Sequence, residues 1–215
     1  MRDAILLQQA YTPDIEHSGL FYDMLRITMQ RHAAYARAWQ MDFQLYFGDY
    51  IPGMDVMTGA WHKIAMIKDA LAKGYEYVFW LDTDAAICNF NVDLRSAFTV
   101  EGDIGACEHD ANGIPPHLNV GVLFVRNSEK SRRFIDDWIA TYPGDKRWFE
   151  QGSFNELAKK YQETVFKMDD RFNATVNVNE VTKLVIKGWH GIMPIQKRFE
   201  MMKKFFWQDH IKYRV

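Results

Sequence analysis

Short apolar segments alternate with helix-like segments along the first half of the chain, and this alternation constrains the fold more than any other feature. Residues 4–9 (AILLQQ), 42–47 (DFQLYF) and 77–81 (YVFWL) have the length and apolar content of buried strands. Between them lie residues 19–39, free of internal Gly or Pro, and residues 61–74, whose apolar positions recur at helical spacing before Gly74. Strand–helix–strand units of this kind favour a parallel sheet covered by helices.

The second half continues with strands and helices, without repeats or a low-complexity linker. A length of 215 residues suits one large domain or two small ones, and the first half implies parallel strand–helix–strand units. Ser128 is the expected N-cap of one helix. The expected strands are 103–108, 120–126, 164–168 and 182–190, and a further helix is expected over 148–161.

Composition and charge exclude several classes of protein. The formal net charge is −2, so nothing indicates a general nucleic-acid binder. No apolar run reaches the roughly 20 residues of a membrane span, and the N-terminus lacks the pattern of a signal peptide. Cys88 and Cys107 form neither a disulfide framework nor a CxxC pattern, which favours the reducing cytoplasm. In that setting the glycosylation acceptor pattern at residues 173–175 is attributed to chance.

Two aspartates, Asp82 and Asp84, follow directly after the apolar segment 77–81. In open parallel sheets, ligands bind beyond the carboxyl ends of the strands. Residues two apart in a strand point to the same side, so both carboxylates could share one Mg²⁺ or Mn²⁺ ion. Such an ion often also binds phosphate oxygens, and a diphosphate would complete the site. A turn without metal is the alternative for a bare D-x-D.

The order of several motifs resembles a family of retaining glycosyltransferases with the A-type fold, the galactosyl-, mannosyl- and xylosyltransferases. The shared features are Trp61-His62-Lys63, the strand ending in WLDTDA at residues 80–85, and NVGVLFVRN at residues 119–127 before a helix with a Trp. They continue with Glu150-Gln151, where the family has Asp-Gln, and with His190-Gly191. The resemblance covers residues 55–195. It implies one A-type domain over residues 1–215, an α/β fold with a Rossmann-like, mixed but mostly parallel sheet flanked by helices. Usual members also carry a membrane anchor, which is not expected here, and longer loops around the acceptor.

The resemblance implies a set of site residues, each with a structural alternative. It makes Asp82, Asp84 and His190 the ligands of Mn²⁺ or Mg²⁺; a core or surface histidine is the alternative for His190. Asn119 and Gln151 would face the donor sugar as catalytic residues, or else be a turn residue and a helix-surface amide. Residues expected to bind the nucleotide sugar, or otherwise to be packing or solvated residues, are Gln8, Ala10, Tyr11, Lys63, Thr83 and Lys197.

The function that the resemblance implies is transfer of a sugar, with retention, from a nucleotide diphosphate to a hydroxyl acceptor, with UDP-sugar as the expected donor. Retention would use an enzyme carboxylate, for which Glu150 and Asp145 are candidates, or attack from the leaving-group face with help from Gln151. A non-catalytic nucleotide-sugar or carbohydrate-binding module is one alternative. A haloacid-dehalogenase-type phosphatase is another, although Ala86 stands where that family needs Thr or Val.

Two further segments have ambiguous roles. His109, Asp110 and His117 belong to a loop that could line the acceptor side, but ordinary loop residues are the favoured interpretation. The C-terminal segment from Lys197 interleaves basic and aromatic residues. We expect its aromatic side to dock on the domain with its lysines in solvent, rather than to contact a membrane.

Overall fold

The computed structural model describes residues 2–10, 18–51, 60–99, 101–111, 114–144, 148–175 and 184–212. The strands are β1 (Arg2–Ala10), β2 (Asp42–Phe47), β3 (Tyr75–Leu81), β4 (Ala85–Ile87), β5 (Ile104–Ala111), β6 (Ile114–Arg126), β7 (Val165–Lys167) and β8 (Ile186–Gly188). The α-helices are α1 (Ser18–Ala38), α2 (His62–Ala72), α3 (Glu129–Ala140), α4 (Phe149–Ala158) and α5 (Ile195–Lys212), and two 3₁₀ turns cover Leu94–Ala97 and Asp170–Phe172.

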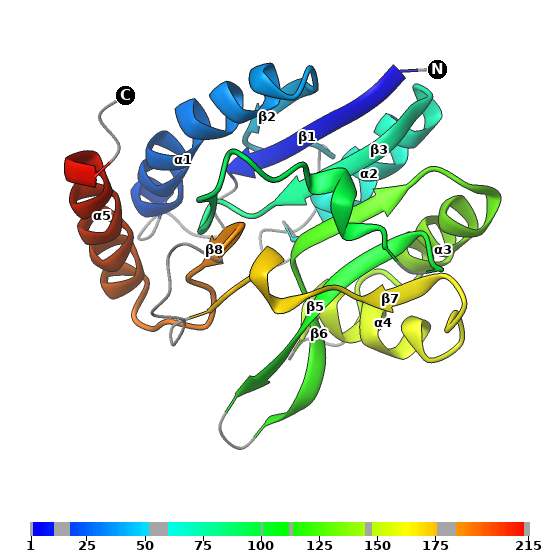
Figure 1. Cartoon of the computed structure of the whole chain (residues 1–215). Coiled ribbons are helices and arrows are strands. Elements are labelled where there is room, and N and C mark those ends of the chain that lie inside the picture. The colour runs from blue at the N-terminus through cyan, green and yellow to red at the C-terminus, as the bar shows by residue number, and fades with distance from the viewer. Residues whose placement is uncertain are drawn as a thin grey trace.

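Six strands form one mixed sheet in the order β2-β1-β3-β6-β5-β7 (Figure 1). β1 pairs in parallel with both β2 and β3, as the strand–helix alternation predicts. β6 then pairs antiparallel with β3 and β5, and β7 returns parallel to β5. Three of the five pairings are thus parallel, and the expected mixed α/β sheet is confirmed.

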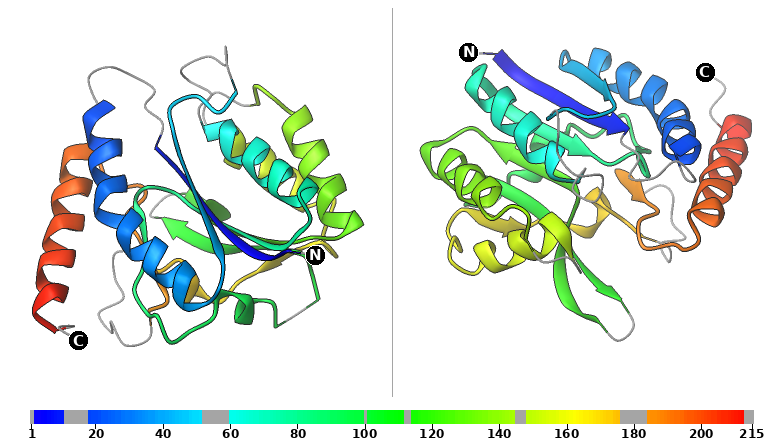
Figure 2. Two further views of the ribbon diagram at one scale, coloured as in Figure 1. Left: turned by 90° about the horizontal axis from the view of Figure 1, so that it is seen from above. Right: turned by 180° about the vertical axis from the view of Figure 1, so that it is seen from behind.

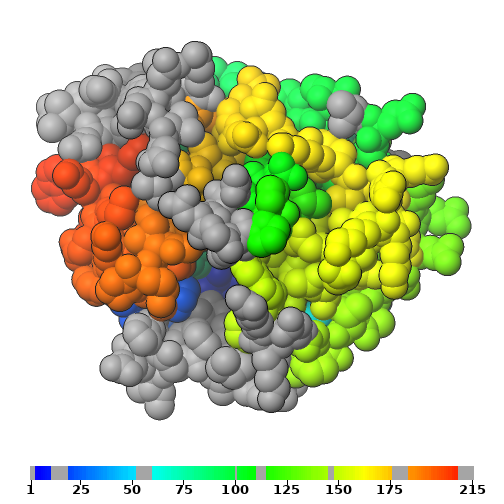
Figure 3. Space-filling view, turned by 90° about the horizontal axis from the view of Figure 1, so that it is seen from below, coloured from blue at the N-terminus to red at the C-terminus, as the bar shows by residue number. Residues whose placement is uncertain are grey.

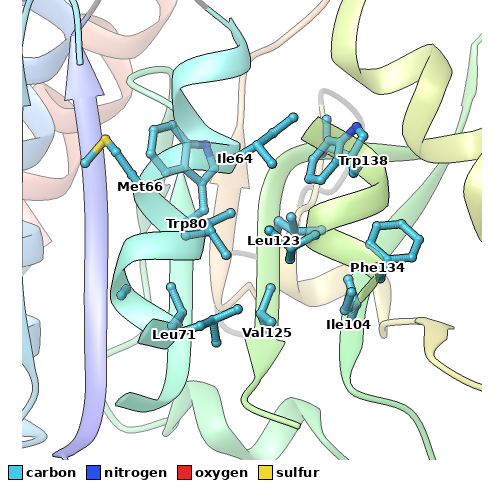
Figure 4. Packing of buried hydrophobic residues seen from close by; sticks show 14 of the residues in the cluster. Ile64, Met66, Leu71, Trp80, Ile104, Leu123, Val125, Phe134 and Trp138 are labelled. Carbon is cyan, nitrogen blue, oxygen red and sulfur yellow. The ribbon is translucent and has the colours of Figure 1, made fainter. Parts of the chain in front are cut away.

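The sheet is buried on both faces, which explains why its central strands are almost continuously apolar. Successive side chains of a strand point to opposite faces. Val78 and Trp80 accordingly pack with α2 and α3, whereas Phe79 and Leu81 pack toward α1. Figure 2 shows the two helical layers on either side of the sheet, and Figure 4 the packing of Ile64, Leu123 and Trp138 in the first layer.

Helix α3 begins where the sequence predicts. The Ser128 hydroxyl accepts a hydrogen bond from the Ser131 amide at 3.0 Å, while the Ser131 hydroxyl accepts one from the Ser128 amide at 2.9 Å. This reciprocal capping box satisfies two amides that the helix itself leaves unpaired. Asp103 fixes the cap in place by accepting a hydrogen bond from the Ser128 hydroxyl at 2.7 Å.

The C-terminal segment forms α5, which lies beside α1 (Figures 1 and 2). Met202, Phe205 and Phe206 of α5 pack with Met24 of α1 and with Trp189. The expected docking of the aromatic side is therefore confirmed, although Trp207 is 78% exposed.

Within the described residues, no helix is both long enough and apolar enough to cross a membrane.

One short pairing was not predicted from the sequence. β4 and β8 form a separate antiparallel ladder with Ala85 opposite Gly188. This ladder brings the segment after Asp84 beside the segment before His190, which are about a hundred residues apart in sequence. It is the structural link between the two predicted halves of the metal site.

Candidate active site

The candidate site lies at the carboxyl end of β3, between the β4–β8 ladder and the part of β6 that runs past that end. The Asp82 amide donates a hydrogen bond to the Gly121 carbonyl at 2.8 Å, which joins the D-x-D segment to β6. In Figure 3 the β5–β6 region (green) lies between the C-terminal segment (orange) and α4 (yellow), beside a recess with blue N-terminal atoms at its floor.

Asp82 is held by donors on one of its two oxygens. Oδ1 accepts hydrogen bonds from Trp80 Nε1 at 2.7 Å and from Lys63 Nζ at 3.2 Å. Oδ2 and Asn119 Oδ1 each lie 3.0 Å from the point that a Gly121 Cβ would occupy. Glycine therefore leaves room for both side-chain oxygens at this position. Desolvation raises the pKa of the Asp82 carboxyl despite the nearby Lys63 charge, so added positive charge would stabilise its ionised form.

Lys63 is a buried cation between two carboxylates. Its side chain is 4% exposed, and Nζ lies 3.2 Å from Asp82 Oδ1 and 3.0 Å from Glu150 Oε1. Nζ also donates to the Val120 carbonyl at 3.3 Å. The alternative of a solvated lysine on an exposed helix face is thus wrong. Glu150 is 8% exposed, and its ion pair with Lys63 links α4 to α2 next to Asp82.

Asp84 forms an ion pair with α5. Its Oδ2 lies 2.7 Å from Nη1 of Arg198, and the two side chains are only 6% and 13% exposed. Its backbone carbonyl accepts a hydrogen bond from the Trp189 amide at 2.9 Å. The C-terminal helix therefore contributes directly to the D-x-D environment.

Asn119 and Gln151, the expected catalytic residues, both bind backbone amides of β6 near Val120. Asn119 Oδ1 accepts hydrogen bonds from the Gly121 amide at 2.9 Å and from Asn173 Nδ2 at 3.1 Å. Gln151 Oε1 accepts one from the Val120 amide at 3.3 Å. β6 thus brings both side chains close to the segment that pairs with Asp82.

His190 lies beyond β8 and forms a hydrogen bond with His109 of β5, with 3.1 Å between His190 Nε2 and His109 Nδ1. Its other nitrogen, Nδ1, is shielded from solvent and has no hydrogen-bond partner within the described part of the chain. Burial lowers the pKa of His190 well below its usual value, and the nearby Arg198 and Lys63 charges lower it further. The imidazole is therefore neutral at pH 7, the form that binds metals.

Gln8 and Ala10, predicted to lie near a nucleotide, have fully buried side chains. Gln8 Nε2 donates to the Thr28 hydroxyl at 3.0 Å, and Gln8 Oε1 lies 3.1 Å from His32 Nδ1. His32 is itself buried, which lowers its pKa to about 3. Gln8 thus belongs to an internal network behind Asp82, and its contact with a nucleotide stays a prediction. Tyr11 falls outside the described residues.

The predicted metal triad is not assembled in this structure. Among the described residues, no group of three or more His, Cys, Asp or Glu side chains lies close enough together to hold an ion. The chemistry nevertheless fits a divalent cation, because Asp82 and Asp84 offer carboxylate oxygens and His190 has an unpartnered nitrogen. The assignment of Asp82, Asp84 and His190 as ligands stays a prediction.

Comparisons with known proteins lead to glycosyltransferases. A profile of the galactosyl transferase GMA12/MNN10 family matches residues 6–101, which include the strand ending in Asp82 and Asp84. "Probable glycosyltransferase 7" of Oryza sativa, in both the indica and japonica subspecies, is 27% identical over 132 residues. That match covers 56% of this chain and 28% of the relative, so the chain spans little more than a quarter of the relative's length.

Solved structures decide the fold. A glycosyltransferase involved in glycosylation of the major capsid of PBCV-1 aligns with a TM-score of 0.71 at 17% identity, covering 95% of this chain and all of that one. Mouse xyloside xylosyltransferase 1 in its apo form aligns with a TM-score of 0.54 at 11% identity, covering 89% of this chain and 99% of that one. The chain has the A-type glycosyltransferase fold. Together with the profile match, this fold confirms the resemblance inferred from the ordered motifs.

Within this A-type domain, sequence reasoning missed the role of Arg198. Lys197 was predicted to reach the diphosphate, but Lys197 is exposed and the neighbouring Arg198 contacts Asp84. The helical spacing contained the signal, because Arg198 lies four residues before Met202, which is fully buried. Lys197 as a diphosphate ligand, like Thr83 between the two aspartates, stays a prediction.

Proposed function

We propose that this chain is a metal-dependent glycosyltransferase. It moves a sugar from a nucleotide diphosphate, with UDP-sugar as the expected donor, to a saccharide or other hydroxyl acceptor. The observation that carries the proposal is the position of Asp82 and Asp84 at the carboxyl edge of β3 in an A-type fold, where ligands of such sheets bind.

Asp82, Asp84 and His190 would hold Mn²⁺ or Mg²⁺. When bound, the ion supplies positive charge for the leaving diphosphate. Trp80 and Lys63 orient Asp82 by donating hydrogen bonds to its Oδ1, which leaves Oδ2 available for the ion. Arg198, already beside Asp84, is a second cation within the same region.

Gln151 is the proposed catalytic amide. Its Oε1 accepts one hydrogen bond from the Val120 amide, and a carbonyl oxygen has a second lone pair for positive charge developing on the sugar. Glu150, by contrast, is buried and paired with Lys63, which makes it a poor nucleophile. Asp145, the other candidate carboxylate, falls outside the described residues. Among the described groups near Gln151, this arrangement favours attack from the leaving-group face, with retention of configuration.

The proposal predicts UDP release when the chain is incubated with Mn²⁺ and a panel of UDP-sugars. For the best donor, Gln151→Ala should lower kcat by about 10²-fold while the Kd for UDP stays within about twofold, because the amide acts mainly in the transition state. The matched control is Gln162→Ala, which removes an exposed amide and should leave both constants unchanged.

The same assay separates the alternatives. Donor binding without UDP release from any sugar would indicate a binding module, and release of inorganic phosphate would indicate a phosphatase. Normal turnover by Gln151→Ala would show that Gln151 is a structural amide on α4.

A further inference from the structure

Two histidines from distant parts of the sequence form a short hydrogen-bonded network that ends on a backbone carbonyl. His109 and His190 are 81 residues apart, with 3.1 Å between His190 Nε2 and His109 Nδ1. Their ring planes are within 14° of each other. On its far side, His109 Nε2 lies 3.1 Å from the backbone carbonyl oxygen of Asn173.

The Asn173 carbonyl at the end of this network determines where each proton lies. A carbonyl oxygen only accepts, so His109 Nε2 carries the proton in its bond to Asn173. A neutral imidazole carries a proton on one ring nitrogen only, so with the proton on Nε2 the Nδ1 of His109 has a lone pair. His190 Nε2 must then donate to that lone pair, which leaves His190 Nδ1 without a proton.

The unprotonated His190 Nδ1 is packed against Gly188 and Asn173. Nδ1 lies 2.8 Å and Asn173 Oδ1 2.6 Å from the point that a Gly188 Cβ would occupy, with His190 Cε1 nearer still, so only glycine lets the two side chains approach here. Neither atom has a hydrogen-bond partner among the described residues. Asn173 Nδ2 donates to Asn119 Oδ1, so Asn173 Oδ1 is an acceptor as well. Two unpaired acceptors therefore lie near one point, an arrangement that only a donor or a cation would satisfy.

We propose that His109 is a positioning residue, which holds His190 in the tautomer whose Nδ1 lone pair is available to a divalent cation. The cation's identity rests on the proposed function, whereas the tautomer follows from contacts within the chain. Histidines that bind metals usually donate their second N–H to such a partner, which fixes both ring orientation and tautomer. Here the partner is another histidine, which is anchored in turn by the Asn173 carbonyl.

The test uses the metal-free full chain labelled with ¹⁵N in its histidines. Two-bond ¹H–¹⁵N correlation spectra distinguish the two neutral tautomers, and His109→Gln and His190→Gln assign the signals. We expect both His109 and His190 to carry their proton on Nε2. A proton on His190 Nδ1 in the wild type would overturn the proposal.

Three variants test whether His109 is the cause. In His109→Leu, which lacks an acceptor, His190 should become a mixture of tautomers, and Mn²⁺ affinity should fall by about 10- to 100-fold. His109→Gln keeps an acceptor and a donor, and should retain most of both properties. His117→Leu is the control, because His117 is a half-buried histidine of β6 that pairs in register with His109 but contacts the Pro115 carbonyl of its own strand.

The outcomes separate the positioning role from the metal site itself. An unchanged tautomer or unchanged Mn²⁺ affinity in a folded His109→Leu would overturn the role of His109. If His109→Leu does not fold, judged by its circular dichroism, the wild-type tautomer and the affinity retained by His109→Gln still decide the matter. If the wild type shows the Nε2–H tautomer of His190 but His190→Ala binds Mn²⁺ as tightly as the wild type, the metal assignment in the proposed function fails.

Discussion

Replacing Asp84 with asparagine is expected to reduce sugar transfer by at least about 10²-fold, the scale seen when one group that stabilises transition-state charge is removed. The substitution keeps the shape of the side chain but removes the negative charge that the diphosphate-bound cation needs. UDP release from the best donor measures the effect. Wild-type turnover by Asp84→Asn would remove Asp84 from the site.

Asp84→Asn also affects folding, and a second substitution separates the two effects. The Asp84–Arg198 pair is 6% and 13% exposed, so the single variant leaves a nearly buried guanidinium without its counter-charge. Such a loss costs about 3–5 kcal/mol. At about 2–4 °C per kcal/mol for a chain of this size, Tm should fall by roughly 10 °C. Asp84→Asn combined with Arg198→Gln should recover most of the Tm but none of the activity. Recovery of activity in the double variant would contradict the catalytic role of Asp84.

Lys63→Met is expected to destabilise the fold about as much as Asp84→Asn does. The methionine fills a similar volume, but Glu150, 8% exposed, and Asp82, 33% exposed, lose the charge between them. Stranding buried charge costs about 3–5 kcal/mol, so Tm should again fall by roughly 10 °C. Burial opposes the Lys63 charge, but the Asp82 and Glu150 carboxylates outweigh it and raise the pKa of Lys63 above its usual 10.5. A lysine whose pKa is raised on folding stabilises the fold fully at any pH below its pKa in the unfolded chain. The stability difference between the wild type and Lys63→Met should therefore be constant between about pH 6 and 9.

Two controls accompany Lys63→Met. Adding Glu150→Gln removes the stranded buried carboxylate and should recover much of the Tm, because a pair removed together costs far less than one partner alone. Lys68 lies on the same helix as Lys63. Lys68→Met breaks its ion pair with Asp136 of α3, which has a distance of 2.7 Å and side chains that are both at least half exposed. That change should cost no more than about 1 kcal/mol. Equal losses from Lys63→Met and Lys68→Met would show that the buried pair does not stabilise the fold.

Much of the fold could be predicted from the sequence because local patterns coincide with the tertiary arrangement. The strand through Phe79 is apolar on both faces, and Ser128 stands just before a run of helical spacing. β4 was missed because three residues, Ala85–Ile87, carry no periodicity, and their pairing depends on β8 far along the chain. The composition of the C-terminal segment predicted that its aromatic side docks on the domain, but it did not predict that the segment is a helix.

The candidate site was harder to predict because its contacts join distant segments. Asp82 and Asp84 could be identified from their position after an apolar strand. Arg198 could not, since its role requires α5 to pack beside α1 and return to the D-x-D segment. His109 was interpreted as an ordinary loop residue, and only the three-dimensional structure brings it to His190. Gln8 lies at the correct strand end, but its side chain points into the interior toward Thr28.

The most direct test of the central claim is the affinity for UDP measured by calorimetry in Mn²⁺ and again in EDTA. The account predicts that UDP binds at least about 10-fold more tightly with Mn²⁺, because Asp82, Asp84 and a diphosphate are all negative and need a shared cation. The same advantage should disappear in Asp82→Asn combined with Asp84→Asn. Equal affinities with and without metal in the wild type would contradict a cation held between the D-x-D carboxylates and the nucleotide.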